Sequence, residues 1–118
     1  TLAGNTNFNT NAATNGGGIY NNAGTTTFTR LATFNNNTAT NGGAVYNNTT
    51  GALIFSNGAT FNNNTATTAG GGAYLNGGTV ALAGGATFTS NTAGATGGGA
   101  IYKTGSTLNI TGASTFTS

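Results

Sequence analysis

The chain repeats one phrase at intervals of 26 to 28 residues, and this regular spacing constrains its fold more than any other feature. Each copy opens with the pattern Phe-x-x-Asn and continues with small residues, a glycine pair and a tyrosine; the copy from Ala32 to Tyr46 is the clearest. The opening phenylalanines are Phe8, Phe34, Phe61, Phe88 and Phe116. Because a repeat of this length cannot bury its own apolar face, the pattern predicts a stacked array of similar units.

The residues between these landmarks favour strands over helices. Gly, Asn and Thr are abundant, and all three are poor helix formers. Each repeat contains three short alternating apolar segments separated by Gly- and Asn-rich corners, for example Leu53–Phe55, Ala59–Phe61 and Gly72–Tyr74. The sequence therefore predicts an all-β fold, a parallel β-helix (β-solenoid) of about 4.5 coils of 26–28 residues with three short strands per coil. Neighbouring coils would lie roughly 4.8 Å apart.

In such a stack, equivalent residues form ladders that run from coil to coil. We expect the five phenylalanines to point inward, together with a second ladder of Leu2, Phe28, Phe55, Leu82 and Ile110. A third inward ladder would contain Ile19, Val45 and Ile101. In the third copy either Ala73 takes the inward place with Tyr74 outside, or Tyr74 turns inward and Leu75 is exposed; we favour Ala73, which keeps the tyrosines of the repeats outside as one ladder. A corner ladder is expected from the asparagines of the pattern, because their amides can bond the turning backbone and each other: Asn11, Asn37, Asn64 and Asn91. The glycine pairs, which we place at Gly16–Gly17, Gly42–Gly43, Gly71–Gly72 and Gly98–Gly99, would supply positive φ angles at the next corner.

The composition leaves little room for catalysis, metal binding or nucleic-acid binding. Arg30 and Lys103 are the only charged side chains, and the sequence contains no Asp, Glu, His or Cys. General acid–base catalysis, carboxylate calcium sites and thiolate metal sites all need residue types that are missing here. We therefore expect no enzyme activity, no cofactor and no metal. Two separated cations do not form a nucleic-acid footprint, and no apolar run is long enough to span a membrane as a helix.

The outward positions beside the phenylalanines form two regular files of threonine and asparagine, which we take as a possible binding face. The files begin at Asn7 and Asn9 and continue through Thr33, Asn35, Thr60, Asn62, Thr87, Thr89, Thr115 and Thr117. Uncharged β-solenoids with such files resemble the ice-binding faces of antifreeze proteins. The alternative is that threonine simply suits exposed strand positions. A glycan-binding groove along the outer tyrosines is a third possibility.

The paired motifs Phe-x-x-Asn and Gly-Gly-Ala-(Ile/Val/Leu) resemble those of the chlamydial polymorphic membrane proteins. The clean matches are Phe34–Asn37 with Gly42–Val45, and Phe88–Asn91 with Gly98–Ile101. This resemblance implies an autotransporter-like passenger: a secreted, right-handed β-helix at the cell surface that acts in adhesion.

Taken together, these features predict a non-enzymatic, extracellular structural protein, belonging to a surface adhesin or to a self-assembling surface filament. We expect residues 1–118 to form a single repeat array that is a fragment or a repeating unit of a longer array or filament. Unpaired strand edges and the near absence of charge favour end-to-end self-association. A host or neighbouring cell surface is the other expected partner, and ice binding through the threonine and asparagine files is the alternative function.

Overall fold

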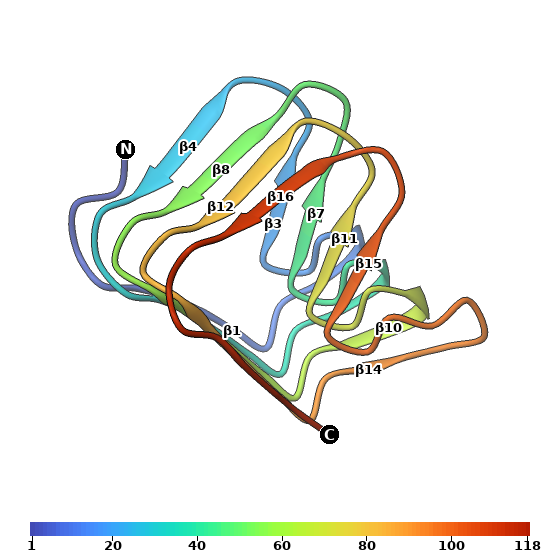
Figure 1. The fold of residues 1–118 in the computed structure, drawn as a ribbon. Helices are drawn as coiled ribbons and strands as arrows, with labels where there is room; N and C mark the ends of the chain where they lie inside the picture. Colours follow the sequence, from blue (N-terminus) through green and yellow to red (C-terminus); the bar gives the residue numbers. More distant parts are fainter.

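A computed structural model describes all residues from Thr1 to Ser118 as a β-solenoid of about four turns, with strands and no helices. The chain winds repeatedly around one interior, and each strand pairs in parallel with the equivalent strand of the next coil (Figure 1). These pairings build four parallel sheets, which we call walls 1 to 4. The predicted all-β, parallel solenoid is therefore confirmed.

Walls 1 and 2 meet at the corner that holds the pattern asparagines. Wall 1 contains β1 (Thr6–Asn9), β5 (Ala32–Asn35), β9 (Ala59–Asn62), β13 (Ala86–Thr89) and β17 (Thr115–Thr117). Wall 2 contains β2 (Ala12–Asn15), β6 (Thr38–Asn41), β10 (Thr65–Ala69) and β14 (Thr92–Ala93).

Walls 3 and 4 complete each coil, and their strands lie side by side in Figure 1. Wall 3 contains β3 (Ile19–Asn21), β7 (Val45–Asn47), β11 (Ala73–Leu75) and β15 (Ile101–Lys103). Wall 4 contains β4 (Thr25–Phe28), β8 (Ala52–Phe55), β12 (Thr79–Leu82) and β16 (Thr107–Ile110).

The prediction of three strands per coil is wrong, because wall 2 is a fourth strand that the sequence reading did not separate from its corner. The inward residues of wall 2 are small alanines; Ala39 is 6% exposed and Ala66 is 1% exposed. A strand that buries only methyl groups has no large apolar residue to mark its alternation. The threonines on either side of these alanines, such as Thr38 and Thr65, are exposed.

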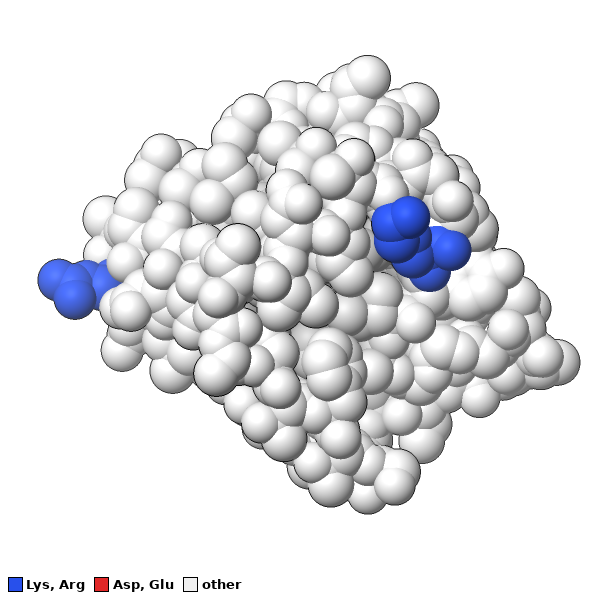
Figure 2. Space-filling view, in the orientation of Figure 1, with Lys and Arg blue, Asp and Glu red and all other residues white.

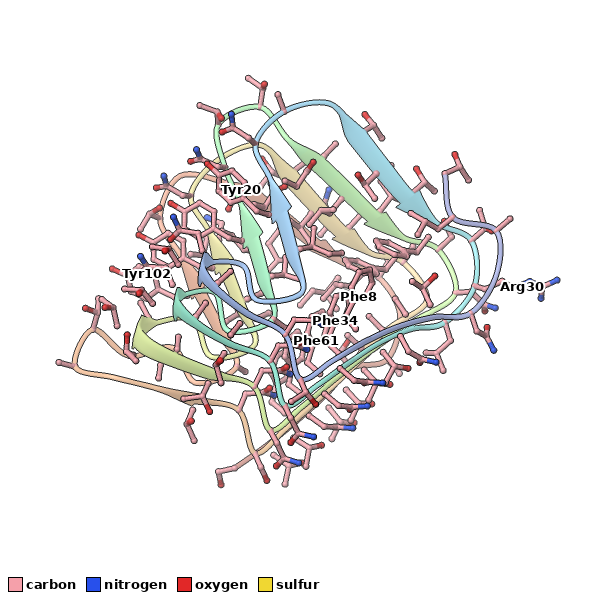
Figure 3. The ribbon with its side chains drawn as sticks, turned by 180° about the vertical axis from the view of Figure 1, so that it is seen from behind. Phe8, Tyr20, Arg30, Phe34, Phe61 and Tyr102 are labelled. Carbon is pink, nitrogen blue, oxygen red and sulfur yellow. The ribbon has the colours of Figure 1, made fainter.

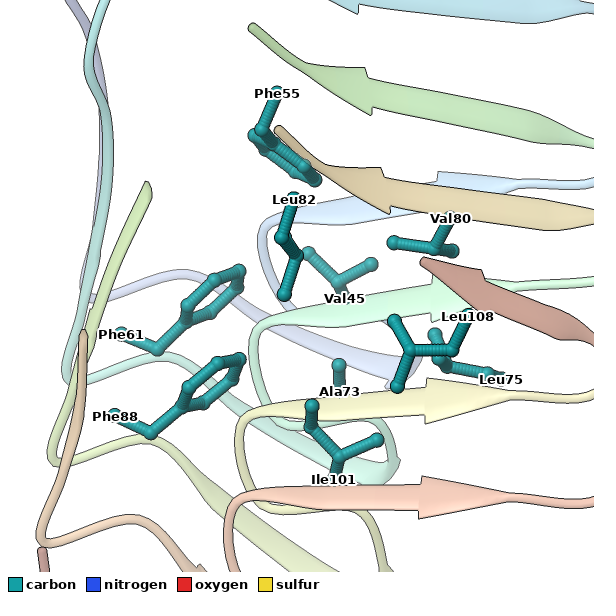
Figure 4. A pocket seen from close by; sticks show the side chains of 10 residues that line it. All are labelled: Val45, Phe55, Phe61, Ala73, Leu75, Val80, Leu82, Phe88, Ile101 and Leu108. Carbon is teal, nitrogen blue, oxygen red and sulfur yellow. The ribbon is translucent and has the colours of Figure 1, made fainter. Parts of the chain in front are cut away.

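The interior is filled by ladders from walls 1, 3 and 4. Phe34, Phe61 and Phe88 are at most 1% exposed, and neighbouring rings stack with centroids 4.8 and 4.4 Å apart. Phe55 of wall 4 meets Phe34 edge-on at 6.2 Å, so aromatic contacts also cross between walls. The remaining void among the apolar side chains in Figure 4 has a volume of only about 10 Å³. Such close packing makes the core sensitive to any change of volume.

The corner between walls 2 and 3 is built from the glycine pair. Gly42 has a φ of 62° and its equivalents Gly16, Gly70 and Gly98 have similar positive values. In the third coil the corner pair is therefore Gly70 and Gly71, not Gly71 and Gly72 as the sequence alignment placed it. Three consecutive glycines, Gly70 to Gly72, stand at this corner, so the sequence allows two placements of the pair. An irregularity in β10, where the register shifts between Ala66 and Ala69, adds one residue before the corner. The third inward ladder is restored at Ala73, which pairs with Val45 and Ile101.

Candidate functional site

The five pattern phenylalanines form one continuous ladder, the Phe ladder: Phe8, Phe34, Phe61, Phe88 and Phe116. Its central rings point into the interior, as the labelled Phe34 and Phe61 do in Figure 3. At the ends the ladder is less covered, and Phe116 is 51% exposed although its ring stacks on Phe88 at 5.0 Å. The Phe ladder is therefore a structural element of the core.

The pattern asparagines form a second ladder, the corner Asn ladder: Asn11, Asn37, Asn64 and Asn91. Its two central members, Asn37 and Asn64, are fully buried. The Oδ1 atom of Asn64 accepts the backbone N–H and the Nδ2 amide of Asn37, both at 3.0 Å. Asn64 Nδ2 donates to Asn91 Oδ1 at 2.9 Å and to the Phe34 carbonyl at 3.0 Å. The amides of Asn37 and Asn64 thus join their own coils to both neighbouring coils, and no buried polar side-chain atom lacks a partner.

A buried asparagine that sequence reasoning missed lies at the corner between walls 3 and 4. Asn47 is fully buried, and its Nδ2 donates to the carbonyls of Gly51 and Gly77 at 2.9 and 2.8 Å. Its Oδ1 accepts Asn21 Nδ2 at 2.7 Å. The available signal was an asparagine directly after Ile-Tyr or Val-Tyr in two copies. In the third copy the equivalent residue is Leu75, which is also buried.

The outer surface of wall 1, the wall 1 face, carries the predicted threonine and asparagine files in exact coil-to-coil register. One file contains Asn7, Thr33, Thr60, Thr87 and Thr115, and the other contains Asn9, Asn35, Asn62, Thr89 and Thr117. In the second file Asn35 Nδ2 donates to Asn9 Oδ1 and Asn62 Nδ2 donates to Asn35 Oδ1, both at 3.1 Å. The face is therefore a regular array of short, uncharged, hydrogen-bonding side chains.

The outer surface of wall 3 combines aromatic rings with amides. The tyrosines of successive coils stack into the Tyr ladder, which contains Tyr20, Tyr46, Tyr74 and Tyr102. Beside it runs a hydrogen-bonded file that we call the outer Asn ladder, which contains Asn22, Asn48, Asn76 and Thr104. The outer position of the tyrosines was predicted from the sequence. The adjoining amide file was not, although an asparagine follows Tyr-Asn or Tyr-Leu in three copies.

The environment of Tyr46 in the Tyr ladder raises its pKa above the ordinary value of 10.0. Partial burial is the main cause, and the neighbouring phenols of Tyr74 and Tyr20 disfavour a second negative charge; a hydrogen bond with Asn76 acts in the opposite direction. The unfolded chain therefore loses this proton at a lower pH than the folded chain does.

The raised pKa of Tyr46 predicts how the free energy of unfolding depends on pH. Since the unfolded state binds fewer protons once the pH exceeds about 10, the free energy of unfolding should fall above that pH. Between about pH 3 and 9 it should be nearly constant, because the sequence has no carboxyl or imidazole side chain to titrate. Urea unfolding followed by circular dichroism from pH 3 to 11 measures this profile. An acid transition within the flat range, or a gain of stability above pH 10, would contradict it.

The surface is almost free of charge. Figure 2 shows two separate blue groups on an otherwise white surface, and Arg30 points away from the body in Figure 3. No group of three or more His, Cys, Asp or Glu residues is present to hold a metal ion. No helix is long and apolar enough to cross a membrane.

The repeats of this chain are similar to a known protein repeat. Residues 32–48 and 85–104 match the Chlamydia polymorphic membrane protein repeat. These two stretches of the chain are thus similar to polymorphic membrane protein repeats. The resemblance found in the motifs is confirmed, and a repeat of this type indicates association with the cell surface. No curated protein and no solved structure shows significant similarity to the chain.

The matched repeats coincide with the interior and corners of the solenoid rather than with an exposed site. In residues 32–48 the pattern residues Phe34, Asn37, Ala44 and Val45 are all at most 1% exposed. In this chain the matched residues therefore form contacts between neighbouring coils, as Phe34 and Asn37 do with Phe61 and Asn64. Both the repeat and the fold are of a structural kind.

Proposed function

We propose that this chain is a structural β-solenoid section of an extracellular surface protein that acts in adhesion. The proposal rests on one observation: within each coil, the motif residues and the outward residues occupy different positions and can serve different purposes. Motif residues such as Phe34, Asn37 and Val45 are buried in the stack, whereas the outward residues repeat once per coil on flat walls. A section of this kind can present many equal, uncharged contacts to another surface. Repeated weak contacts made together give a strong attachment without any single deep pocket.

Retention of coated beads on cells tests this proposal. Fluorescent microspheres carrying the purified chain would be applied to epithelial cell monolayers and washed under flow, with albumin-coated spheres of equal density as the control. We expect the chain to retain several times more spheres than albumin does. Equal retention of the two kinds of sphere would contradict an adhesive role.

A filament is the second form that a structural role can take. The outermost strands of wall 1, β1 and β17, each pair on one side only, and two cations give little repulsion between copies. Electron microscopy of the purified chain at increasing concentration distinguishes the two forms. Continuous filaments with an axial repeat of about 4.8 Å would favour stacking of copies. Separate particles at all concentrations would favour the adhesin section.

Ice binding is a second candidate function, favoured by the register of the wall 1 face. Its two files lie on one sheet, with side chains about 4.8 Å apart between coils and about 6.6 to 6.8 Å apart along each strand. An ordered array of this kind can hold water in a fixed lattice at its surface.

Thermal hysteresis of the freezing point measures this activity directly. Thr60→Tyr places a bulky ring in the middle of the wall 1 face, and we expect it to remove more than half of the hysteresis. Thr65→Tyr makes the same substitution at an exposed position of wall 2 and should leave the hysteresis unchanged. Absence of hysteresis in the unmodified chain, or equal values for the two variants, would rule out the wall 1 face as an ice-binding site.

A further inference from the structure

We propose that the Tyr ladder and the outer Asn ladder together bind an extended, neutral oligosaccharide that lies along the axis of the solenoid. The inference rests on the proposed adhesive function and names the surface and the class of ligand that would serve it.

The first observation is the partly open stacking of the tyrosine rings. Tyr46 and Tyr74 are parallel within 4° with centroids 4.9 Å apart. This separation exceeds the roughly 3.5 to 4.0 Å contact distance of carbon atoms, so the rings are offset and part of each face is left uncovered. The flanking pairs are tilted by 36° and 38°, and Tyr20 is 51% exposed. The Tyr ladder thus exposes a series of offset apolar ring faces, with a phenol hydroxyl on each ring.

The second observation is the ordered amide file beside the rings. Asn48 Nδ2 donates to Asn22 Oδ1 and Asn76 Nδ2 donates to Asn48 Oδ1, both at 2.8 Å, and Thr104 Oγ1 donates to Asn76 Oδ1 at 2.9 Å. These bonds fix the side chains before any ligand arrives, which lowers the entropy cost of binding. Asn48 Oδ1 and Asn76 Oδ1 each accept one of these bonds, so a second lone pair of each remains for a ligand hydroxyl. Asn22 Oδ1 also accepts Thr49 Oγ1 at 3.1 Å and the Tyr20 hydroxyl at 3.4 Å, so it is already saturated.

The chemistry of this surface selects an uncharged, hydroxyl-rich partner. Apolar ring faces suit the C–H faces of a pyranose, and the neighbouring amides and phenols suit its hydroxyl groups. No charged side chain belongs to either ladder, and Lys103, beside Tyr102, is the one cation on wall 3. An anionic partner would therefore gain little here, whereas a neutral sugar can be bound without desolvating an ion.

The repeat distance of the surface favours a sugar chain over a peptide. The tyrosine centroids are 4.9 to 5.4 Å apart, so one binding unit recurs with each coil. An extended peptide advances only about 3.3 to 3.6 Å per residue and would lose register with the ladder. A chain of pyranose rings linked across the ring advances by about one ring length per unit, close to this spacing. Four coils offer contacts to several consecutive sugars.

Tyrosine fluorescence provides a site-specific test, because the chain has no tryptophan and all four of its tyrosines belong to the Tyr ladder. The purified chain would be titrated with hexasaccharides of β-1,4-linked glucose, β-1,4-linked N-acetylglucosamine and α-1,4-linked glucose. We expect a saturable change of emission with at least one of them. Tyr74→Ala should weaken that binding about tenfold or more, as the loss of a central aromatic contact does. Thr60→Ala, on the wall 1 face, should bind like the unmodified chain.

The outcomes separate this inference from the adhesive function. Circular dichroism checks that Tyr74→Ala is folded; if it is not, Tyr20→Ala at the more exposed end of the ladder replaces it. No saturable change with any hexasaccharide, or equal binding by the tyrosine and threonine variants, overturns the sugar site. If the beads still adhere to cells in that case, adhesion stands and uses another face. Adhesion that is abolished by protease treatment of the cells but survives periodate oxidation of their glycans would also overturn it.

Discussion

Replacing Asn64 by leucine should lower the free energy of unfolding by about 3 to 5 kcal/mol. The side chain is fully buried and makes four hydrogen bonds to three other residues of the neighbouring coils. Leucine is similar in size but accepts and donates nothing. The backbone N–H and the side-chain amide of Asn37 would therefore stay buried without their acceptor, and each such group costs about 1 to 3 kcal/mol. Urea unfolding followed by circular dichroism measures the loss.

Asn62→Leu is the matched control, because it makes the same substitution two residues away on the outer side of wall 1. Asn62 donates one hydrogen bond, to Asn35 Oδ1 at 3.1 Å, and both side chains are only partly buried. We expect this variant to lose less than about 1 kcal/mol. If Asn64→Leu and Asn62→Leu unfold at the same urea concentration, the corner Asn ladder does not hold the coils together.

The main ladders could be predicted because the sequence repeats its large residues at nearly constant spacing. Phe34, Phe61 and Phe88 must stack if successive coils are in register, and any slip would expose these rings. The pattern asparagines follow each phenylalanine by three residues, so their ladder follows from the same register. One repeated landmark therefore determines much of the coil, including the outward side on which the tyrosines lie.

Wall 2 and the third glycine corner could not be predicted, because their signals are small residues. Ala39 and Ala66 fill the inside of wall 2, and an alanine between threonines looks the same in a loop as in a strand. The bulge in β10 adds one residue before the corner, so a count from Phe61 at the spacing of the first two copies reaches Ala69, one position before Gly70. A register shift of this kind depends on how β10 pairs with β6 of the preceding coil, and the sequence of one repeat does not show that pairing.

The candidate surfaces were predictable as outward positions but not as separate sites. Asparagine is so frequent that the buried Asn47 and the outer Asn48 look alike in the sequence, although one bonds the Gly51 and Gly77 carbonyls and the other extends the outer Asn ladder. Burial separates the two roles. The same applies to Asn62 and Asn64, which stand on opposite sides of one chain segment.

Replacing Gly43 by alanine should destabilise the solenoid by about 3 kcal/mol or more, because the new methyl group has no space. A Cβ atom at this position would lie 2.3 Å from the Gly71 carbonyl oxygen and 2.7 Å from the Thr65 backbone nitrogen. Both atoms belong to the next coil, so the clash can be relieved only by moving two coils apart. The same close approach recurs at Gly17 and Gly71, which indicates that it is a general requirement of the stack.

Two control variants separate this steric effect from backbone strain. Gly4→Ala adds a methyl group where no atom lies within 4 Å and should change stability by less than about 0.5 kcal/mol. Gly24→Ala also has open space, but its φ of 79° is unfavourable for alanine, so we expect a loss of about 1 kcal/mol. Thermal melting of the three variants gives the order directly. If Gly43→Ala melts with Gly4→Ala, the coils are not in the close contact that the second glycine of the pair provides; if it melts well below Gly24→Ala, the glycine is required for stacking rather than for its backbone freedom.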